Sequence, residues 1–406
     1  MPLEENRNPL RKLPRNVWAA TATSFLTDVS SEMLLTLLPL FLANVLGTPT
    51  AVIGIIEGIA ETTSSLLKLA SGWLSDKLST RKWLAVAGYG ISAISKPFLY
   101  FTATWAGVLL VRFSDRVGKG IRTAPRDALI ADSIQPEHRG LAFGLHRAGD
   151  TAGAVLGLTI ALVVVMATQA ESLAMTREMF QTLVIVSTIP ALLAVGVLIG
   201  FAREVRSEKK SAPVRLSLAG LNPDFKYFLV VIAIFTLGNS SDAFLVLRAQ
   251  ERGLSVVGIT AMLITFNVVY SVLSGPLGAW SDKIGRRRLI IGGWLAYGLI
   301  YLGFAGANTG EQIWLVYALY GIYYAAVEGT AKAYVADLVP SEKRGTAYGL
   351  YNAVVGLMAL PASVLAGILW QLFGPAAPFV SGAVLALIAV GLLQMHRPGV
   401  QPSHTV

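Results

Sequence analysis

Long apolar segments alternate with short polar ones along almost the whole chain. Each apolar segment is long enough for a helix that crosses a bilayer, which needs about 20 residues. The pattern predicts twelve membrane-spanning helices, at residues 16–46, 51–75, 82–103, 105–133, 139–167, 180–202, 226–248, 255–280, 287–306, 312–338, 344–372 and 376–395. The fold class expected from this pattern is all-α.

The composition agrees with a membrane protein that crosses the bilayer many times. Hydrophobic residues make up 54% of the 406 residues and charged residues only 14%, against about 25% in an average soluble domain. The mean hydropathy is +0.60. A single soluble core could not bury this much apolar surface, which excludes a soluble enzyme. Because the chain has no cysteine, disulfides, thiolate nucleophiles and cysteine-ligated metals are excluded as well.

The net charge of +9 is concentrated in alternate loops, which argues against nucleic acid as a partner. Basic residues precede the first span, follow the second, and recur in every other loop, with exceptions at Arg177, Arg248 and Arg252. By the positive-inside rule, both termini and the long central loop are predicted to be cytoplasmic. We therefore expect a multi-pass protein of the cell inner (plasma) membrane.

Two sequence patterns recur at a nearly constant offset, which predicts a duplicated unit. The run Gly72–Lys77 returns as Gly278–Lys283 at an offset of 206. The pair Ala131-Asp132 with Arg139-Gly140 returns as Ala336-Asp337 with Arg344-Gly345. The predicted organisation is an N-terminal six-helix bundle at residues 1–202, a cytoplasmic linker at 203–225 and a C-terminal six-helix bundle at 226–406. Such a duplication predicts a substrate site near the bilayer midplane.

The repeated loop resembles the signature of the major facilitator superfamily, Gly-x-x-x-Asp-Lys/Arg-x-Gly-Arg-Lys/Arg. Gly278–Arg287 matches it, whereas Gly72–Arg81 departs from it, because Ser79 and Thr80 replace Gly-Arg and imply a weaker turn. The resemblance implies two pseudo-symmetric bundles and a gating role for the loops, with an inert solvated loop as the alternative. The implied gating residues are Gly72, Asp76, Lys77, Arg81, Gly278, Asp282, Lys283, Gly285, Arg286 and Arg287.

Charged residues inside the predicted spans are costly in lipid and indicate a functional site. On the fourth span, five cations fall within an arc of about 120° at 100° per residue. They are Arg112, Arg116, Lys119, Arg122 and Arg126. An Arg in the outer half of this span, as at Arg112, resembles the superfamily pattern. The alternative is that these cations only neutralise acids on neighbouring helices.

Carboxylates on the first two spans are candidates for proton coupling, because burial and nearby cations shift their pKa in opposite directions. Asp28 and Glu32 lie four residues apart and so share one face of a helix. Glu61 is the third predicted coupling residue, with a static ion pair to Lys68 as its alternative role. We expect Glu57 to lie near the outer surface.

The second half offers fewer charges, which together predict a polar cavity. Glu328 and Lys332 are four residues apart, and an intrahelical salt bridge is their alternative role. The predicted substrate-binding residues of the whole chain are Arg112, Arg122, Arg126, Asn239, Asp242, Glu328 and Lys332.

These features predict a secondary active transporter that works by alternating access and is coupled to protons. Gly149-x-x-x-Gly153-x-x-x-Gly157 partly resembles the antiporter signature of superfamily exporters but lacks its proline, and so only slightly favours export. There is no phosphate-binding loop for ATP and no spacing of nucleophile and base, so neither an enzyme nor a cofactor is expected. The expected partners are a small-molecule substrate, protons and the lipid bilayer, and the expected state is a monomer.

Two substrate classes compete. The first is a small polar organic anion, zwitterion or metal chelate held by Arg122, Arg126 and Lys332. The second is a lipophilic cation, as for a multidrug/proton antiporter, held by Asp28, Glu32 and Asp242. The alternative of another class is a transport-inactive membrane sensor or scaffold.

Overall fold

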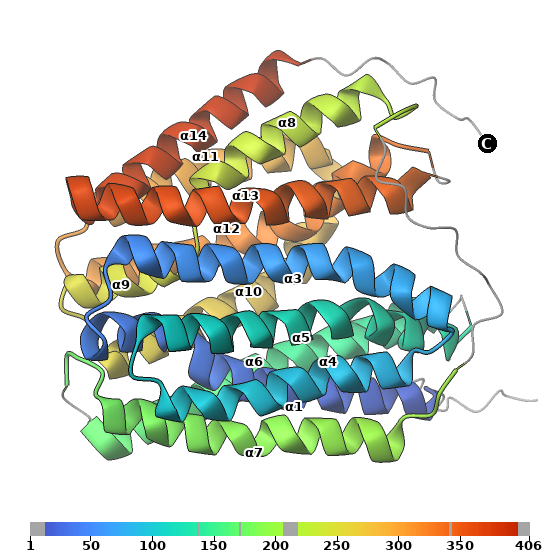
Figure 1. Ribbon diagram of the computed structural model, residues 1–406. Coiled ribbons are helices and arrows are strands. Elements are labelled where there is room, and N and C mark those ends of the chain that lie inside the picture. Colours follow the sequence, from blue (N-terminus) through green and yellow to red (C-terminus); the bar gives the residue numbers. More distant parts are fainter. Residues whose placement is uncertain (1–12, 136–137, 170–171, 206–217, 341–342, 397–406) are drawn as a thin grey trace, which may run out of the picture. The chain divides into compact units, whose positions relative to one another are not determined.

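The computed structural model describes residues 13–135, 138–169, 172–205, 218–340 and 343–396, and every regular element in these ranges is a helix (Figure 1). The α-helices are α1 (Arg15–Leu35), α2 (Leu38–Leu40), α3 (Thr50–Leu78), α4 (Lys82–Ser95), α5 (Trp105–Asp132), α6 (Arg139–Gln169), α7 (Arg177–Phe201), α8 (Pro223–Gly238), α9 (Ala243–Glu251), α10 (Val256–Ile284), α11 (Arg286–Gly306), α12 (Gly310–Asp337), α13 (Arg344–Phe373) and α14 (Ala377–Met395). A π-helical turn, η2 (Phe41–Val45), follows α2, and a 3-10 stretch, η3 (Lys96–Phe101), follows α4.

These helices confirm the twelve predicted spans and correct three of them, which are interrupted. The first span breaks after α1 because Pro39 has no N–H to donate to the Leu35 carbonyl. The third span tightens into η3 at Lys96, directly before Pro97. The seventh span is split into α8 and α9 by the non-helical residues that follow Gly238. The polar side chains at the breaks therefore stand at helix ends.

Within the described ranges, nine helical segments are long and apolar enough to cross a membrane by their own composition. The other three predicted spans are 82–103, 105–133 and 312–338. The first contains an α-helix of only 14 residues, the second carries the basic stripe, and the third is rich in tyrosine. The first falls short because its α-helix is too short, and the other two because of their polar residues, which mark them as candidates for a site.

Contacts between backbones group the chain into two compact units. Unit 1 comprises Met1–Thr36, Leu67–Val164 and Glu178–Pro213, and unit 2 comprises Leu37–Leu66, Val165–Arg177 and Val214–Val406. The predicted division into bundles at 1–202 and 226–406 stays a prediction. Most of the predicted linker lies outside the described residues.

Unit 1 is built around α1, α4, α5 and α7. Small residues of α1 and α4 pack with Tyr89, Leu129 and Leu198 in its core, all of them buried. A second cluster joins Val17 of α1 to Ile130 of α5. The helix pair α4 and α5 runs in contact along its length.

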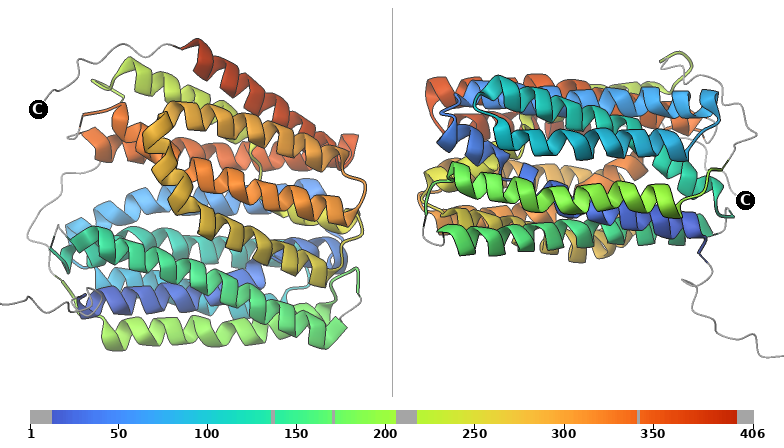
Figure 2. Two further views of the ribbon diagram at one scale, coloured as in Figure 1. Left: turned by 180° about the vertical axis from the view of Figure 1, so that it is seen from behind. Right: turned by 60° about the horizontal axis from the view of Figure 1, so that its bottom comes forward.

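Unit 2 contains α8 to α14 and the first part of α3. Helix α12 packs against both α10 and α11, and these three helices lie side by side in the view from behind (Figure 2). Helix α3 meets α13 along a line of glycines, where a side chain on Gly54, Gly58, Gly356 or Gly367 would overlap the opposite backbone or side chain. Only glycine allows this approach, so the part of α3 that ends at Leu66 packs tightly within unit 2.

Candidate transport site

The basic residues of the predicted fourth span lie on α5, where Thr104 caps the helix by accepting from the Gly107 N–H. In unit 1, α5 and α4 approach closely at Gly88 and Gly118, because a side chain on either glycine would overlap the opposite helix. This contact places the polar side chains of α4 directly against the basic face of α5. Arg112, Arg116 and Arg122 are all buried there.

The predicted substrate ligands Arg122 and Arg126 are held by side chains of unit 1. Arg122 donates from Nη1 to Ser92 Oγ at 2.9 Å, and its guanidinium carbon lies 4.4 Å from the centre of the Tyr89 ring. Arg126 donates to Ser24 Oγ at 3.0 Å and forms an ion pair with Asp127. Ser24 in turn shares a hydrogen bond of 3.0 Å with the Tyr89 hydroxyl. Hydroxyl groups from α1 and α4 thus orient both guanidinium groups.

Lys96 is a buried cation that the sequence reasoning missed. Its side chain is only 1% exposed, and Nζ donates to Ser30 Oγ at 3.0 Å and to Ser31 Oγ at 2.8 Å. The signal was present, because a lysine inside the apolar segment 82–103 is as costly in lipid as the arginines that were singled out. Lys96 therefore belongs to the same polar cluster as the α5 stripe.

Asp28 and Glu32, the leading coupling candidates, face this basic cluster from α1. Both are half-buried. The Asp28 carboxylate interacts electrostatically with Lys119 and Arg122, and the Glu32 carboxylate with Lys119 and Arg112. The structure thus brings the predicted coupling pair and the predicted anion-binding cations together inside unit 1.

The unit 2 candidates Asn239 and Asp242 lie in the break between α8 and α9. The Tyr297 hydroxyl donates to the Gly238 carbonyl at 3.0 Å and to Asn239 Oδ1 at 3.4 Å, and the Tyr320 hydroxyl lies 3.3 Å from Asp242 Oδ1. The Asp242 residue is exposed, whereas Tyr297 and Tyr320 are buried. The break therefore presents a carboxylate at the edge of an aromatic cluster.

Two acidic residues of α3 lie close enough to Asp242 to interact with it electrostatically. Glu57 and Glu61 both interact electrostatically with its carboxylate. The expectation that Glu57 lies near the outer surface is wrong, because Glu57 is only 4% exposed. Glu61 is grouped by contacts with Asp242 in unit 2, whereas Asp28 and Glu32 belong to unit 1. The three predicted coupling residues are therefore divided between the two units.

Glu328 and Lys332 on α12 form the intrahelical salt bridge that their spacing indicates. Lys332 Nζ lies 3.1 Å from Glu328 Oε1, and the Tyr270 hydroxyl of α10 donates to Glu328 Oε2 at 2.7 Å. Half of the Lys332 side chain is exposed. Lys332 in unit 2, like Arg126 in unit 1, is thus a predicted anion-binding cation that already forms an ion pair with a carboxylate of the protein.

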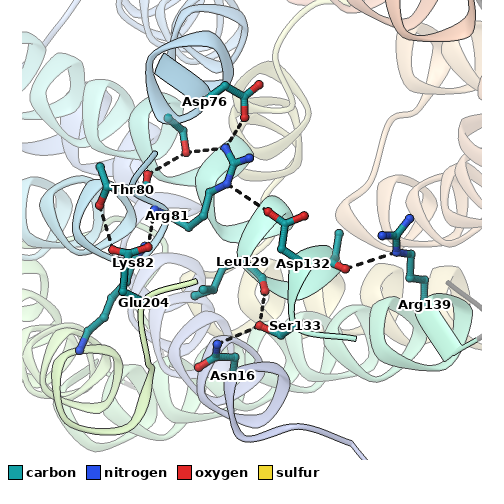
Figure 3. A network of polar contacts seen from close by, with 12 residues as sticks. Asn16, Asp76, Thr80, Arg81, Lys82, Leu129, Asp132, Ser133, Arg139 and Glu204 are labelled. Carbon is teal, nitrogen blue, oxygen red and sulfur yellow. Dashed lines mark hydrogen bonds and ion pairs between the residues drawn. The ribbon is translucent and has the colours of Figure 1, made fainter. Parts of the chain in front are cut away.

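The first copy of the repeated loop is an ion network inside unit 1 (Figure 3). Arg81 forms ion pairs with Asp76, at the end of α3, and with Asp132, at the end of α5, the latter at 3.2 Å. Arg81 Nη1 also donates to Ser75 Oγ at 2.9 Å. Ser79 takes the place of the usual glycine with a left-handed backbone, φ +50°. The weaker turn that the sequence implied is thus closed by ion pairs.

Glu204, which follows α7, completes this network. Its carboxylate accepts from the backbone N–H groups of Arg81 at 2.7 Å and Lys82 at 3.1 Å, and from the Thr80 hydroxyl at 2.9 Å. Partial burial disfavours its charge, but these hydrogen bonds outweigh the burial and hold the pKa of Glu204 below its ordinary value of 4.5. Glu204 thus caps the first turn of α4 with a negative charge.

The second copy of the loop repeats the ion triad in unit 2. Arg286 pairs with Asp282 at 3.1 Å and with Asp337 at 2.5 Å. Gly285 supplies the turn with φ +93°. In the first copy the corresponding pairs to two aspartates are made by Arg81. Arg81 stands one position later in the motif than Arg286 does.

The other predicted gating residues have unequal surroundings. Lys77 Nζ lies 5.0 Å from the centre of the Trp73 ring, and Arg287 donates to the Leu393 carbonyl at the end of α14. Gly72 has the Ala124 side chain at ordinary contact distance, whereas a side chain on Gly278 would meet open space. Lys283 is exposed. The gating role of all these residues stays a prediction.

The repeated loops and the helix count agree with the profile of the Major Facilitator Superfamily, which matches residues 20–247 and again residues 227–405. The chain is a member of this superfamily. An uncharacterized MFS-type transporter of Methanocaldococcus jannaschii, MJ1317, is 38% identical over 397 residues, which is 96% of this chain and 97% of that protein. The tetracycline resistance protein of class C from Escherichia coli is 31% identical over 136 residues, or 32% of this chain and 33% of that protein.

A solved structure in this superfamily supports the fold. The structure of the nucleoside transporter NupG has a TM-score of 0.75 with 14% sequence identity, and the alignment covers 94% of this chain and 98% of that one. At this identity the likeness shows the fold alone. Membership of the superfamily, shown by the profile and by the relative at 38% identity, makes the protein a multi-pass membrane transporter. Its substrate has to be argued from its own residues.

Proposed function

We propose that this superfamily member is a proton-coupled exporter that works by alternating access. The observation that carries the proposal is the meeting of Asp28 and Glu32 with the buried cations of α5 inside unit 1. A carboxylate that faces cations within a membrane span can be charged in one state and protonated in another, which is the requirement for proton coupling. The proposal includes both predicted bundles, cytoplasmic termini and no catalytic chemistry.

The charges around the coupling pair restrict the substrate class. Export driven by inward proton movement requires that proton and substrate exclude one another. A purely anionic substrate would draw Arg112 and Arg122 away from the carboxylates and so favour their protonation. A cationic group on the substrate would instead compete with the proton for Asp28 or Glu32. Among small polar organic anions, zwitterions and metal chelates, we therefore favour the zwitterion or the chelate.

Such a substrate would use both kinds of charge in unit 1. Its anionic part would bind Arg112, Arg122 or Arg126, each of which lies on the same face of α5. Its cationic part would bind Asp28 or Glu32. The partial likeness to a tetracycline resistance protein supports export, although it covers only a third of each chain.

A specific observation favours a second candidate, a lipophilic cation. In unit 2 the exposed carboxylate of Asp242 borders Tyr320, and Tyr320 belongs to a group of rings with Phe266 and Tyr324 at centroid distances of 5.7 and 5.8 Å. Aromatic faces next to a carboxylate suit a desolvated organic cation. This arrangement makes a multidrug/proton antiporter the alternative function.

Proton movement in proteoliposomes separates these possibilities. Vesicles loaded with a pH-sensitive dye and made acidic inside are challenged with zwitterions, metal chelates, organic anions and lipophilic cations in turn. Antiport of a zwitterion or chelate predicts that protons leave the vesicles when that compound is added outside, and that Asp28→Asn abolishes the response while Asp242→Asn keeps it. The reverse pattern would support the lipophilic cation. Proton entry together with an anion would contradict export by antiport.

A further inference from the structure

The end of α7 in unit 1 carries two cations from other helices. Lys82 Nζ, at the start of α4, donates to the Ile199 carbonyl at 2.7 Å, and Arg15 Nη2, at the start of α1, donates to the Gly200 carbonyl at 3.0 Å. Each bond uses one of the three donors of an ammonium or the five of a guanidinium. The contacts thus fix both cations at the end of a membrane-spanning helix.

Both cations also lie over exposed aromatic rings. The guanidinium carbon of Arg15 is 5.5 Å from the centre of the Phe201 ring, and Lys82 Nζ is 4.9 Å from that of Trp83. Phe201 is 58% exposed and Trp83 is 55% exposed, and Trp18, one turn after Arg15, is 45% exposed. Tryptophan and charged cations side by side at the end of a span are typical of the headgroup level of a bilayer.

The nearby acid, Glu204, keeps its negative charge, because its carboxylate accepts from uncharged donors, the Thr80 hydroxyl and the backbone N–H groups of Arg81 and Lys82. A single carboxylate offsets only one of the positive charges of the patch. Figure 3 shows the Lys82 side chain leading away from the Arg81 network. The side chain of Arg203, also at the end of α7, is exposed and adds a further positive charge. The patch is therefore basic and aromatic.

We propose that Arg15, Lys82, Trp83 and Phe201 bind the headgroup of an anionic phospholipid. The negatively charged phosphate would sit at the two cations, while the rings lie at the boundary between headgroup and acyl chain. A capping role alone would account for the two hydrogen bonds to α7 but not for exposed rings beneath both cations. The site does not depend on the transported substrate.

The test compares lipid compositions with the full-length protein in nanodiscs. Wild-type protein in phosphatidylcholine mixed with phosphatidylglycerol should have a higher Tm than in phosphatidylcholine alone. The double variant Arg15→Gln/Lys82→Gln should lose most of this increment. The matched control is Arg288→Gln, which removes an exposed arginine from the first turn of α11 and should keep the increment. An unchanged increment in the double variant would overturn the proposal.

A second measurement covers the case in which the double variant does not fold. Brominated phosphatidylglycerol should quench the tryptophan fluorescence of the wild type more than brominated phosphatidylcholine does, and Trp83→Phe should reduce this difference. An equal effect of the two lipids would overturn the proposal. Soluble glycerol phosphate should not reproduce the Tm increment, and if it does, the patch binds a free anion rather than a lipid.

Discussion

The side-chain amides of Asn44 and Gln250 pair reciprocally although 206 residues separate them. Asn44 Nδ2 donates to Gln250 Oε1 at 3.0 Å, and Gln250 Nε2 donates to Asn44 Oδ1 at 2.7 Å. The pair also binds the segment before α7, through the Met175 N–H and the Leu173 carbonyl. This amide clasp joins three segments of unit 2 that the sequence keeps far apart.

Helix α9, which carries Gln250, is anchored to α11 by Arg248. Arg248, which is fully buried, donates to the carbonyls of Phe304 and Ala305 in the last turn of α11 and of Ala307 directly after it. Arg248 also forms an ion pair with Glu251. Gln250 is thus presented from an anchored helix. The two hydrogen bonds between the side-chain amides are exposed to solvent. Each therefore contributes little to the stability of the fold and can break at a small cost in free energy.

Asn44 falls in the predicted bundle 1–202 and Gln250 in the predicted bundle 226–406, which alternating access would move against one another. We therefore predict that the clasp opens during transport. Because the chain has no cysteine, Asn44→Cys/Gln250→Cys gives the only two thiols, and a short bismaleimide should join them and stop substrate flux. The same reagent on either single variant should leave flux intact. Flux that persists in the fully cross-linked double variant would show that the clasp stays closed throughout the cycle.

The two ion triads should differ in their contribution to stability. The Arg81 side chain is 6% exposed between Asp76 and Asp132, whereas Arg286 is 30% exposed beside Asp337, which is 49% exposed. Removing one partner of a buried cation costs more than removing one at the surface. Asp132→Asn should lower the free energy of unfolding by about 2 kcal/mol, and Asp337→Asn by less than about 1 kcal/mol.

Unfolding in a denaturing detergent measures this difference, with the two variants as matched controls for each other. If the two variants lose equal amounts of unfolding free energy, the burial of Arg81 does not make its triad contribute more to stability than that of Arg286.

Glu204 should make stability depend on pH in the acid range. Its pKa is lowered in the folded protein, so its contribution is fully present above the unfolded value near 4.5 and is lost as the pH falls through the lower folded value. Glu204→Gln should therefore have a lower Tm than the wild type at neutral pH, and the gap should narrow below pH 4.5. Thermal unfolding of both proteins across this range checks the sign. A gap that widens on acidification would contradict it.

The sequence predicts the twelve spans because bilayer thickness fixes their length, and it predicts that the two loops are equivalent because their residues recur. It does not predict which residue closes each triad, since Arg81 acts one position later than its counterpart Arg286. The Asn44–Gln250 clasp also escapes prediction, because the pairing of two uncharged amides depends on which loops meet. Lys96 escapes prediction because it is the one charged residue between Trp83 and Thr102, so no helical periodicity marks it as the stripe of α5 is marked.

Lys96 should stabilise unit 1 more than an exposed lysine in a salt bridge stabilises unit 2. Lys96→Gln removes a buried ammonium and leaves Ser30 and Ser31 with a shorter, neutral partner, which should cost about 1–3 kcal/mol. Lys332→Gln removes the half-exposed partner of Glu328 and should cost less than about 1 kcal/mol. Detergent unfolding of both variants measures the two values. A Lys96→Gln variant as stable as the wild type would show that its hydroxyl contacts contribute nothing net.

The glycine line between α3 and α13 should tolerate no side chain. Gly54→Ala would press a Cβ into the Ser363 carbonyl, and because backbone cannot yield as a flexible side chain does, the helices must separate. Overpacking of this kind costs about 1–3 kcal/mol. Gly292→Ala in α11, where a Cβ meets open space, is the matched control and should leave stability unchanged or raise it by up to about 1 kcal/mol. If both variants unfold at the same detergent concentration, close backbone approach is not what holds the first part of α3 against α13.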